Sequence, residues 1–166
     1  MNSSDFPETH MNHAALAGDA LRPPRIRTVA IGLFRRGDGI LVAEGHDQIK
    51  GEIFYRPLGG SIEFGERGHE ALAREMREEV GLEIANTRYL LTVENIFTYM
   101  GEMGHEIVLV YDGEFVDSSV YDMPELVGIE GDIEFRAMWK RLDEFGPGAP
   151  LYPDRLREYL VSQMES

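Results

Sequence analysis

Three glutamates in the middle of the chain have the spacing of a single helix face. Glu75, Glu78 and Glu79 lie in a segment rich in Ala, Leu, Arg, Glu and Met that predicts a helix over residues 66–80. At about 100° per residue, their side chains point into an arc of roughly 100°. Carboxylates gathered in this way repel one another unless a cation lies among them, and such oxygen ligands suit Mg²⁺ or Mn²⁺. The alternative interpretation is a solvated, charged helix face.

The residues before the helix favour the site over the plain charged face. Gly59-Gly60 supplies flexible backbone directly after an apolar segment that predicts a strand over 53–58. Glu66 lies at the expected start of the helix, where the helix dipole favours a carboxylate. Gly81 lies where a helix commonly ends. A loop, a helix start and a row of carboxylates therefore occupy one short stretch of sequence.

Residues 60–82 resemble the Nudix box. The family pattern is Gly, five residues, Glu, seven residues, Arg-Glu, an aliphatic residue, any residue, Glu-Glu, any residue, Gly and an aliphatic residue. The chain matches every fixed position, from Gly60 and Glu66 through the run from Arg74 to Leu82. One difference lies just upstream, where many family members have Pro-Gly-Gly and this chain has Leu58 before the two glycines.

The resemblance implies an α/β fold: a Nudix-type α/β/α sandwich around a mixed β-sheet, formed as a single domain. It implies hydrolysis of a nucleoside diphosphate linked to another moiety X. Mg²⁺ or Mn²⁺ would be held by Glu75, Glu78 and Glu79, with the backbone carbonyl of Gly60 as a further oxygen ligand.

The resemblance also implies a catalytic set made of Glu75, Glu79 and Arg74. Glu75 is the first choice for the general base that accepts a proton from water, and Glu79 is the second. Arg74 would orient the carboxylates through salt bridges and hydrogen bonds, and Glu66 would brace the junction between loop and helix.

Four further residues are candidates for substrate contacts. Arg56 is suited to a two-pronged contact with a phosphate, or to pairing with one of the many acids. Phe54 and Tyr99 are candidates for stacking on a base, although aromatic residues on strands commonly belong to the core. Glu106 follows a glycine-flanked loop and is a candidate contact to metal or substrate, or a turn residue.

A fourth metal-binding carboxylate often comes from the region before the last strand in proteins that resemble this one. Glu130 and Glu134 both lie in such an acidic segment. The sequence does not choose between them, and an ordinary solvated acid is the alternative for each.

The elements that position these residues follow from apolar patterning. Strands are expected at 26–34, 40–44, 53–58, 89–99, 106–115 and 133–139, with a closing helix over 155–163. The two long strands are expected to form a hairpin with a longer loop over 100–105. Residues 1–24 are expected to be a mobile lead-in, and 25–163 the Nudix domain.

Composition narrows the function classes. The chain has 166 residues, enough for one ordinary domain, and is 43% hydrophobic, enough for a core. It has no cysteine, which excludes disulfides, thiolate zinc sites and a cysteine nucleophile. Its net charge of −14 disfavours a nucleic-acid duplex as partner. No targeting or membrane segment is recognised, so a cytoplasmic protein with no membrane partner is expected.

The leading interpretation is a metal-dependent pyrophosphohydrolase acting on a small nucleotide. The alternatives are a house-cleaning nucleoside triphosphatase and an RNA 5′-end pyrophosphohydrolase. A non-catalytic Nudix-like binding module is a further alternative, but loss of box carboxylates would be its mark and none is lost. Homodimers are common among proteins that resemble this one, and the sequence marks no interface.

Overall fold

The computed structural model describes residues 23–164, so the prediction of a lead-in over 1–24 lies almost wholly outside the described residues. In chain order the elements are β1 (Arg27–Arg36), β2 (Gly39–Asp47), β3 (Glu52–Pro57), β4 (Gly59–Ser61), α2 (Gly68–Val80), β5 (Ile84–Tyr99), β6 (Glu102–Phe115), η1 (Ser118–Asp122), β7 (Glu125–Glu130), β8 (Ile133–Arg141), η2 (Leu142–Glu144) and α3 (Arg155–Met164). No helix within 23–164 combines the length and apolar character needed to cross a membrane.

The strands form one mixed sheet in the order β5-β6-β1-β2-β8-β7, with β3 paired to β2 and β4 paired to β1. Strands β1 and β6 are parallel, whereas the other pairs are antiparallel. Strands β1 and β2 pair only beside their turn, at Arg35↔Ile40 and Arg36↔Gly39. Beyond that point the sheet divides into two arms, one built on β1 and the other on β2.

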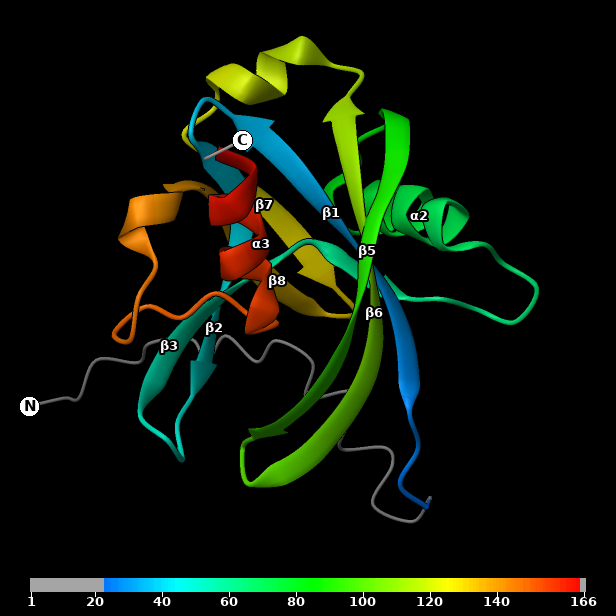
Figure 1. Ribbon diagram of the computed structural model, residues 1–166. Coiled ribbons are helices and arrows are strands. Elements are labelled where there is room, and N and C mark those ends of the chain that lie inside the picture. Colours follow the sequence, from blue (N-terminus) through cyan, green and yellow to red (C-terminus); the bar gives the residue numbers. More distant parts are fainter. Residues whose placement is uncertain (1–22, 165–166) are drawn as a thin grey trace, which may run out of the picture.

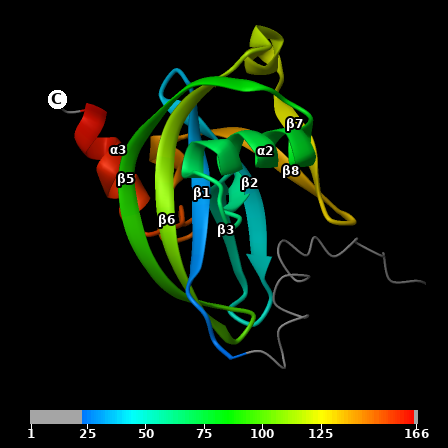
Figure 2. The ribbon, with the colours of Figure 1, turned by 90° about the vertical axis from the view of Figure 1, so that its right-hand side faces the viewer.

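Within residues 23–164, helices α2 and α3 cover opposite faces of the sheet (Figures 1 and 2). Leu72 and Met76 of α2 pack in one core cluster, and Leu156 and Leu160 of α3 pack in the other. Strand β1 supplies both clusters because its side chains alternate, with Ala30 and Phe34 toward α2 and its odd-numbered apolar residues toward α3. Each fully buried leucine stabilises the fold by roughly 2 kcal/mol. This arrangement confirms the α/β/α sandwich around a mixed sheet.

Helix α2 begins two residues later than expected. Glu66 stays outside the helix, in the loop before it. Its carboxylate accepts a hydrogen bond from the backbone N–H of Glu63 at 3.0 Å, which stabilises the loop conformation. At the other end, Gly81 has φ 69°, and its N–H donates to the carbonyl of Arg77. A glycine in this left-handed conformation commonly ends a helix, so the predicted end is confirmed.

The hairpin of β5 and β6 is longer than expected, and its loop is shorter. Tyr99 pairs with Glu102, which leaves Met100 and Gly101 as a two-residue turn. Both turn residues have positive φ, 50° and 80°, the conformation that matches the twist of two antiparallel strands. The prediction of a loop over 100–105 was therefore wrong. Strand β7 was also not predicted.

Candidate active site

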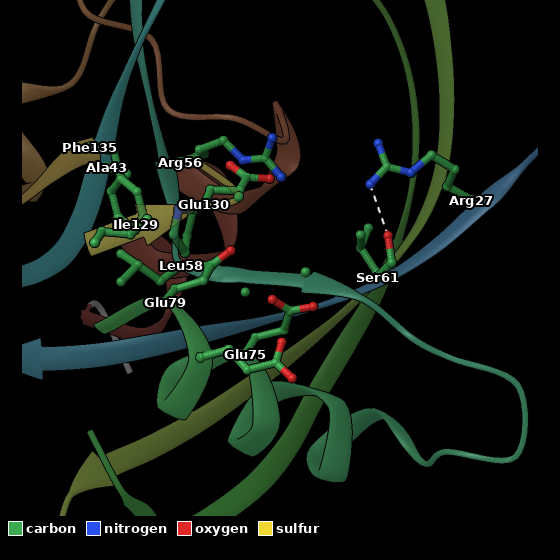
Figure 3. Close-up of a pocket in the computed structure, with 16 residues that line it drawn as sticks. Arg27, Ala43, Arg56, Leu58, Ser61, Glu75, Glu79, Ile129, Glu130 and Phe135 are labelled. Atoms are coloured by element: carbon green, nitrogen blue, oxygen red, sulfur yellow. Dashed lines mark hydrogen bonds between the residues drawn. The ribbon is translucent and has the colours of Figure 1, made fainter. Parts of the chain in front are cut away.

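A cavity of about 330 Å³ lies where the two arms of the sheet separate (Figure 3). It is bounded by strands from both arms, by α2 and by the end of β7. Its acidic and glycine lining residues are Gly59, Gly60, Glu75, Glu78, Glu79, Glu130 and Gly131. The structure thus brings together all four residues that the sequence analysis assigned to a metal.

Two glycines of the β3–β4 segment allow backbone and side chains to approach closely. A Cβ atom on Gly60 would lie 2.4 Å from the carboxyl carbon of Glu75. A Cβ atom on Gly59, whose φ is 150°, would lie 2.0 Å from the carbonyl oxygen of Ala30. Any side chain at either position would push β4 away from its neighbours. The backbone of Gly60 therefore lies directly against the Glu75 carboxylate.

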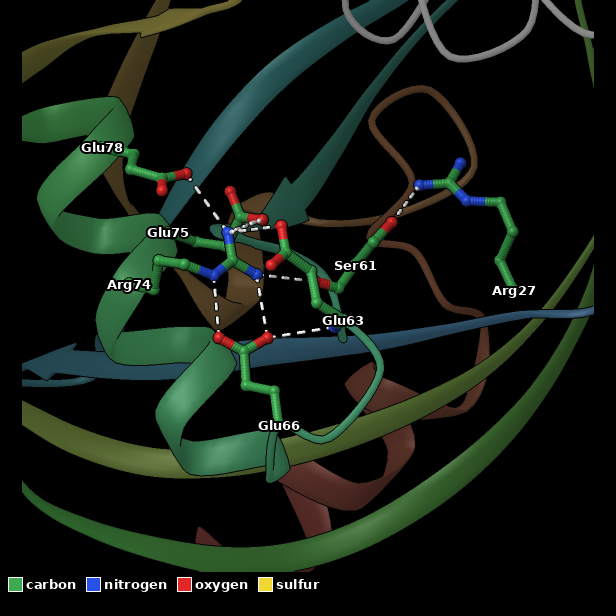
Figure 4. Close-up of polar contacts among 7 residues, drawn as sticks. All are labelled: Arg27, Ser61, Glu63, Glu66, Arg74, Glu75 and Glu78. Atoms are coloured by element: carbon green, nitrogen blue, oxygen red, sulfur yellow. Dashed lines mark hydrogen bonds and ion pairs between the residues drawn. The ribbon is translucent and has the colours of Figure 1, made fainter.

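Arg74 connects the carboxylates of the box to the loop before the helix (Figure 4). Its guanidinium binds Glu66 through two hydrogen bonds, from Nε at 2.7 Å and from Nη2 at 3.0 Å. Nη1 donates to Glu75 at 3.0 Å and to Glu78 at 3.1 Å, and Nη2 also donates to the backbone carbonyl of Ser61 at 2.9 Å. Arg74 does not line the cavity. Glu75 and Glu78, which Arg74 contacts, are among the carboxylates that the resemblance expects it to orient, and Glu66 is the residue expected to brace the junction between loop and helix.

Burial shifts the titration of the two inner carboxyl groups. Burial, followed by the charges of Glu130 and Glu75, raises the pKa of Glu79 to about 8. Burial also raises the pKa of Glu75, although the hydrogen bond and charge of Arg74 act against it. Glu75 and Glu79 also act on each other's pKa. Burial is thus the main reason why both groups hold their protons to a higher pH than an exposed glutamate does.

Glu78 differs from the other two box carboxylates. Its side chain is 59% exposed and turned toward Arg74. Within residues 23–164 no group of three His, Asp or Glu side chains stands close enough together to enclose a metal ion. The carboxylates border a common cavity without closing on one point.

Of the two candidate fourth carboxylates, the structure brings Glu130 to the site. Glu130 ends β7, lines the cavity and acts on the pKa of Glu79. Glu134, on β8, pairs with Ile129 across the hairpin and does not line the cavity. The β7–β8 turn decides the difference, and the sequence analysis could not place that turn because it did not identify β7.

The substrate candidates lie along a second, larger cleft of about 1200 Å³ that adjoins the first. Phe54, Arg56, Tyr99 and Glu106 all line it, and Arg56 lines the carboxylate cavity as well. Phe54 packs edge-on against Tyr99, with ring centroids 5.9 Å apart, and both rings are mostly buried. Glu106 is only 4% exposed and lies 3.6 Å from the guanidinium of Arg27.

Sequence reasoning missed Arg27, which lines both cavities. A signal was available, because Arg27 precedes Val29 and Ile31 at alternating positions of an apolar strand and must share their face. What the sequence lacked was the knowledge that this face opens into a cleft.

Comparisons with known proteins identify the family of the chain. The model of the NUDIX domain matches residues 23–159. The chain is 34% identical over 124 residues to the NAD-capped RNA hydrolase NudC of Pseudomonas aeruginosa, covering 75% of this chain and 39% of that protein. The corresponding protein of Chromobacterium violaceum is 33% identical over 128 residues, with 77% and 42% covered. The chain thus spans about two fifths of the length of these curated relatives.

Solved structures share the fold at lower identity. The MutT NUDIX hydrolase from Burkholderia pseudomallei superposes with a TM-score of 0.60 at 23% identity, over 82% of this chain and 98% of that one. The MutT protein from Methanosarcina mazei Go1 gives a TM-score of 0.57 at 17% identity, over 89% and 100%. With a matching family model over most of its length and a complete box around the cavity, the chain belongs to the Nudix hydrolase family.

Proposed function

We propose that the chain is a metal-dependent pyrophosphohydrolase that cleaves a nucleoside diphosphate linked to another moiety X, with Mg²⁺ or Mn²⁺ as cofactor. The observation that carries this proposal is the meeting of the box carboxylates with the backbone of Gly60 and with Glu130 in one cavity. We further propose small nucleotides as its partners, to the exclusion of nucleic-acid duplexes and membranes, and the cytoplasm as its location.

The donor set supports a divalent cation. Carboxylate oxygens are the ligands that Mg²⁺ and Mn²⁺ prefer. Burial raises the pKa of Glu75 and Glu79 even though Arg74 and Arg56 act against it, so a bound cation would favour the ionised form of both groups. Glu75, Glu78 and Glu79 would hold the cation together with the carbonyl of Gly60, and Glu130 is the candidate for a further ligand. When bound, the cation neutralises phosphate charge and activates a water molecule.

The remaining residues of the site have distinct roles in this proposal. Glu75, whose carboxylate is fixed by Arg74, is the first candidate for the base that accepts a proton from water, and Glu79 is the second. Arg56 would bind a phosphate group, since guanidinium suits that contact. Phe54 and Tyr99 would border the base of the nucleotide in the larger cleft.

A nucleotide panel tests the proposal. The purified chain is incubated with Mg²⁺ or Mn²⁺ and with ADP-ribose, nucleotide sugars, dinucleoside polyphosphates, NADH and each nucleoside triphosphate, and the products are separated by chromatography. We expect release of a nucleoside monophosphate from at least one diphosphate-linked substrate, and loss of that activity when EDTA removes the metal. Hydrolysis of nucleoside triphosphates alone would favour the house-cleaning alternative, and no metal-dependent hydrolysis would contradict the proposal.

A second candidate is hydrolysis of the diphosphate at the 5′ end of a capped RNA. The curated relatives are named NAD-capped RNA hydrolases, and the larger cleft of about 1200 Å³ exceeds the usual size of a small-molecule pocket. The net charge of −14 weighs against a long RNA, because it repels polyanions over about 8 Å at physiological salt.

Competition separates the two candidates. Single-stranded RNA in excess should barely slow hydrolysis of the best small substrate, because the acidic surface gives a long strand no further contacts. Strong inhibition by nanomolar RNA that disappears as salt rises would instead support the capped-RNA candidate.

A further inference from the structure

The two cavities adjoin at a passage that residues common to both define. Among the residues that the structure describes, four line both cavities: Arg27, Val29, Arg56 and Pro57. Val29 and Pro57 are buried and apolar, so the charged groups of the passage are Arg27, from β1, and Arg56, from β3. These strands belong to different arms of the sheet, and Figure 3 shows the two side chains on opposite sides of the cavity, directed toward the space between them.

The surroundings of the passage are acidic on both sides. Four glutamates line the smaller cavity, and the larger cleft is lined by Asp47, Glu52, Glu102, Glu106 and Asp154. Arg25 and Lys50 also line the larger cleft, and Lys50 lies 3.9 Å from Asp47. An anion that extends from one cavity into the other therefore meets two facing positive charges at the passage.

Arg27 is held in place by two neighbours. Glu106 is its cross-strand partner in the parallel β1–β6 pair, with 3.6 Å between Nη1 and Oε1. Its Nη2 donates to the Ser61 hydroxyl at 2.9 Å. These contacts use part of a donor set of five N–H groups, and the side chain is still 21% exposed. The guanidinium is thus fixed before a ligand arrives, which lowers the entropic cost of binding.

We propose that Arg27 and Arg56 bind the same phosphate of the substrate from two sides, at the passage between the carboxylate cavity and the larger cleft. The inference rests on the proposed function and extends it: Arg27 is a substrate-binding residue, and Glu106 and Ser61 are positioning residues that act through it. The ligand group is a phosphate, because planar guanidinium groups pair with its oxygens through two parallel hydrogen bonds.

Binding of an uncleavable nucleotide tests this clamp. The probes are α,β-methylene-ADP, which keeps both phosphates, and adenosine, which has none, each titrated calorimetrically with Mg²⁺ present. Loss of a charge-assisted hydrogen bond in Arg27→Ala should weaken binding of α,β-methylene-ADP about tenfold or more and leave the adenosine titration unchanged. Arg35→Ala is the matched control, because Arg35 lies on the same strand, pairs with Asp112 and lines neither cavity.

A double variant separates ligand binding from a structural role. Arg27→Ala leaves the buried Glu106 without its cation, so a loss of affinity could follow from local rearrangement. Arg27→Gln combined with Glu106→Gln removes both charges and keeps a donor for Ser61. We expect this variant to unfold near the wild-type temperature and to bind α,β-methylene-ADP as weakly as Arg27→Ala.

The outcomes are distinguishable. Wild-type affinity in Arg27→Ala, or restored affinity in the double variant, would overturn the clamp and leave the proposed function intact. If the wild-type chain neither binds α,β-methylene-ADP nor cleaves any nucleotide of the panel, the proposed function fails and the clamp fails with it.

Discussion

Asp47, on β2, accepts a hydrogen bond from the backbone N–H of Met100 at 3.0 Å, although the two residues are 53 positions apart. The same carboxylate accepts from the N–H groups of Ile49 and Lys50 at 3.0 and 2.9 Å, and its side chain is 2% exposed. One buried carboxylate therefore joins the β2–β3 turn to the β5–β6 turn. Residues of both turns line the larger cleft, so this contact fixes the two turns relative to each other beside it.

This contact makes stability depend on pH. Burial acts to raise the pKa of Asp47, but the backbone hydrogen bonds and the charge of Lys50 outweigh it and lower the pKa below the ordinary 3.8. A lowered pKa means that the ionised form stabilises the fold, fully above the ordinary value and progressively less as the pH falls toward the folded-state value. Asp47→Asn should therefore lower the free energy of unfolding by about 1 kcal/mol or more at pH 7. Urea unfolding should show that the gap to wild type narrows below pH 4, and a gap as wide at pH 3 as at pH 7 would contradict this.

Gly60→Ala tests the close approach of β4 to Glu75. The added Cβ would lie 2.4 Å from the Glu75 carboxyl carbon, so either the strand or the carboxylate must move. Misplacing a reacting group by about 1 Å costs on the order of 100-fold in turnover. Gly146→Ala is the matched control, since a Cβ there meets nothing within 4 Å. The measurement is the steady-state rate of each variant with the best substrate of the panel. Equal rates in the two variants would show that turnover does not depend on the close approach of Gly60 to Glu75.

Arg74→Lys tests the two-pronged contact with Glu66. Lysine keeps the charge but cannot make both hydrogen bonds, and the pair is largely buried, with side chains 19% and 16% exposed. The free energy of unfolding should fall by about 2 kcal/mol. Arg77→Lys, at a half-exposed arginine that pairs with Glu83, should change it by no more than about 0.5 kcal/mol. Denaturant titration of both variants measures the two free energies of unfolding. Similar small losses in both variants would show that the paired hydrogen bonds from Arg74 to Glu66 contribute little to stability.

Glu130 and Glu134 form a natural comparison on one hairpin. Glu130→Gln removes a carboxylate that lines the cavity, so turnover should fall about tenfold or more. Glu134→Gln makes the same chemical change outside the cavity and should leave turnover unchanged. A larger loss of turnover in Glu134→Gln than in Glu130→Gln would exclude Glu130 from the site.

Much of the fold was predictable because its signals are local. The alternation of β1 and the apolar face of α2 follow from periods of two and about 3.6 residues, and Gly81 ends the helix as expected. The position of Glu66 just before the helix was less predictable, because its bonds to Glu63 and Arg74 compete with helix formation. Local patterning cannot show that competition.

The box carboxylates were predictable as a group, whereas the rest of the site depends on tertiary structure. Arg27 and Arg56 approach the same passage only because β1 and β2 separate after two residue pairs. Phe54 and Tyr99 do lie along one cleft, which patterning along the sequence could not show. Their rings pack against each other because tertiary contacts bring β3 close to the end of β5. Such relationships follow from the packing of the two arms of the sheet and not from any one segment.

The most direct test of a metal centre in the cavity is a calorimetric titration with Mn²⁺ of the wild-type chain, Glu78→Gln and Glu79→Gln. Removing one of several mutually repelling carboxylates should cost the fold little, so both variants should unfold within a few degrees of wild type, whereas Mn²⁺ affinity should fall about tenfold or more. Unchanged Mn²⁺ affinity in both variants would contradict the assignment of these carboxylates to the metal.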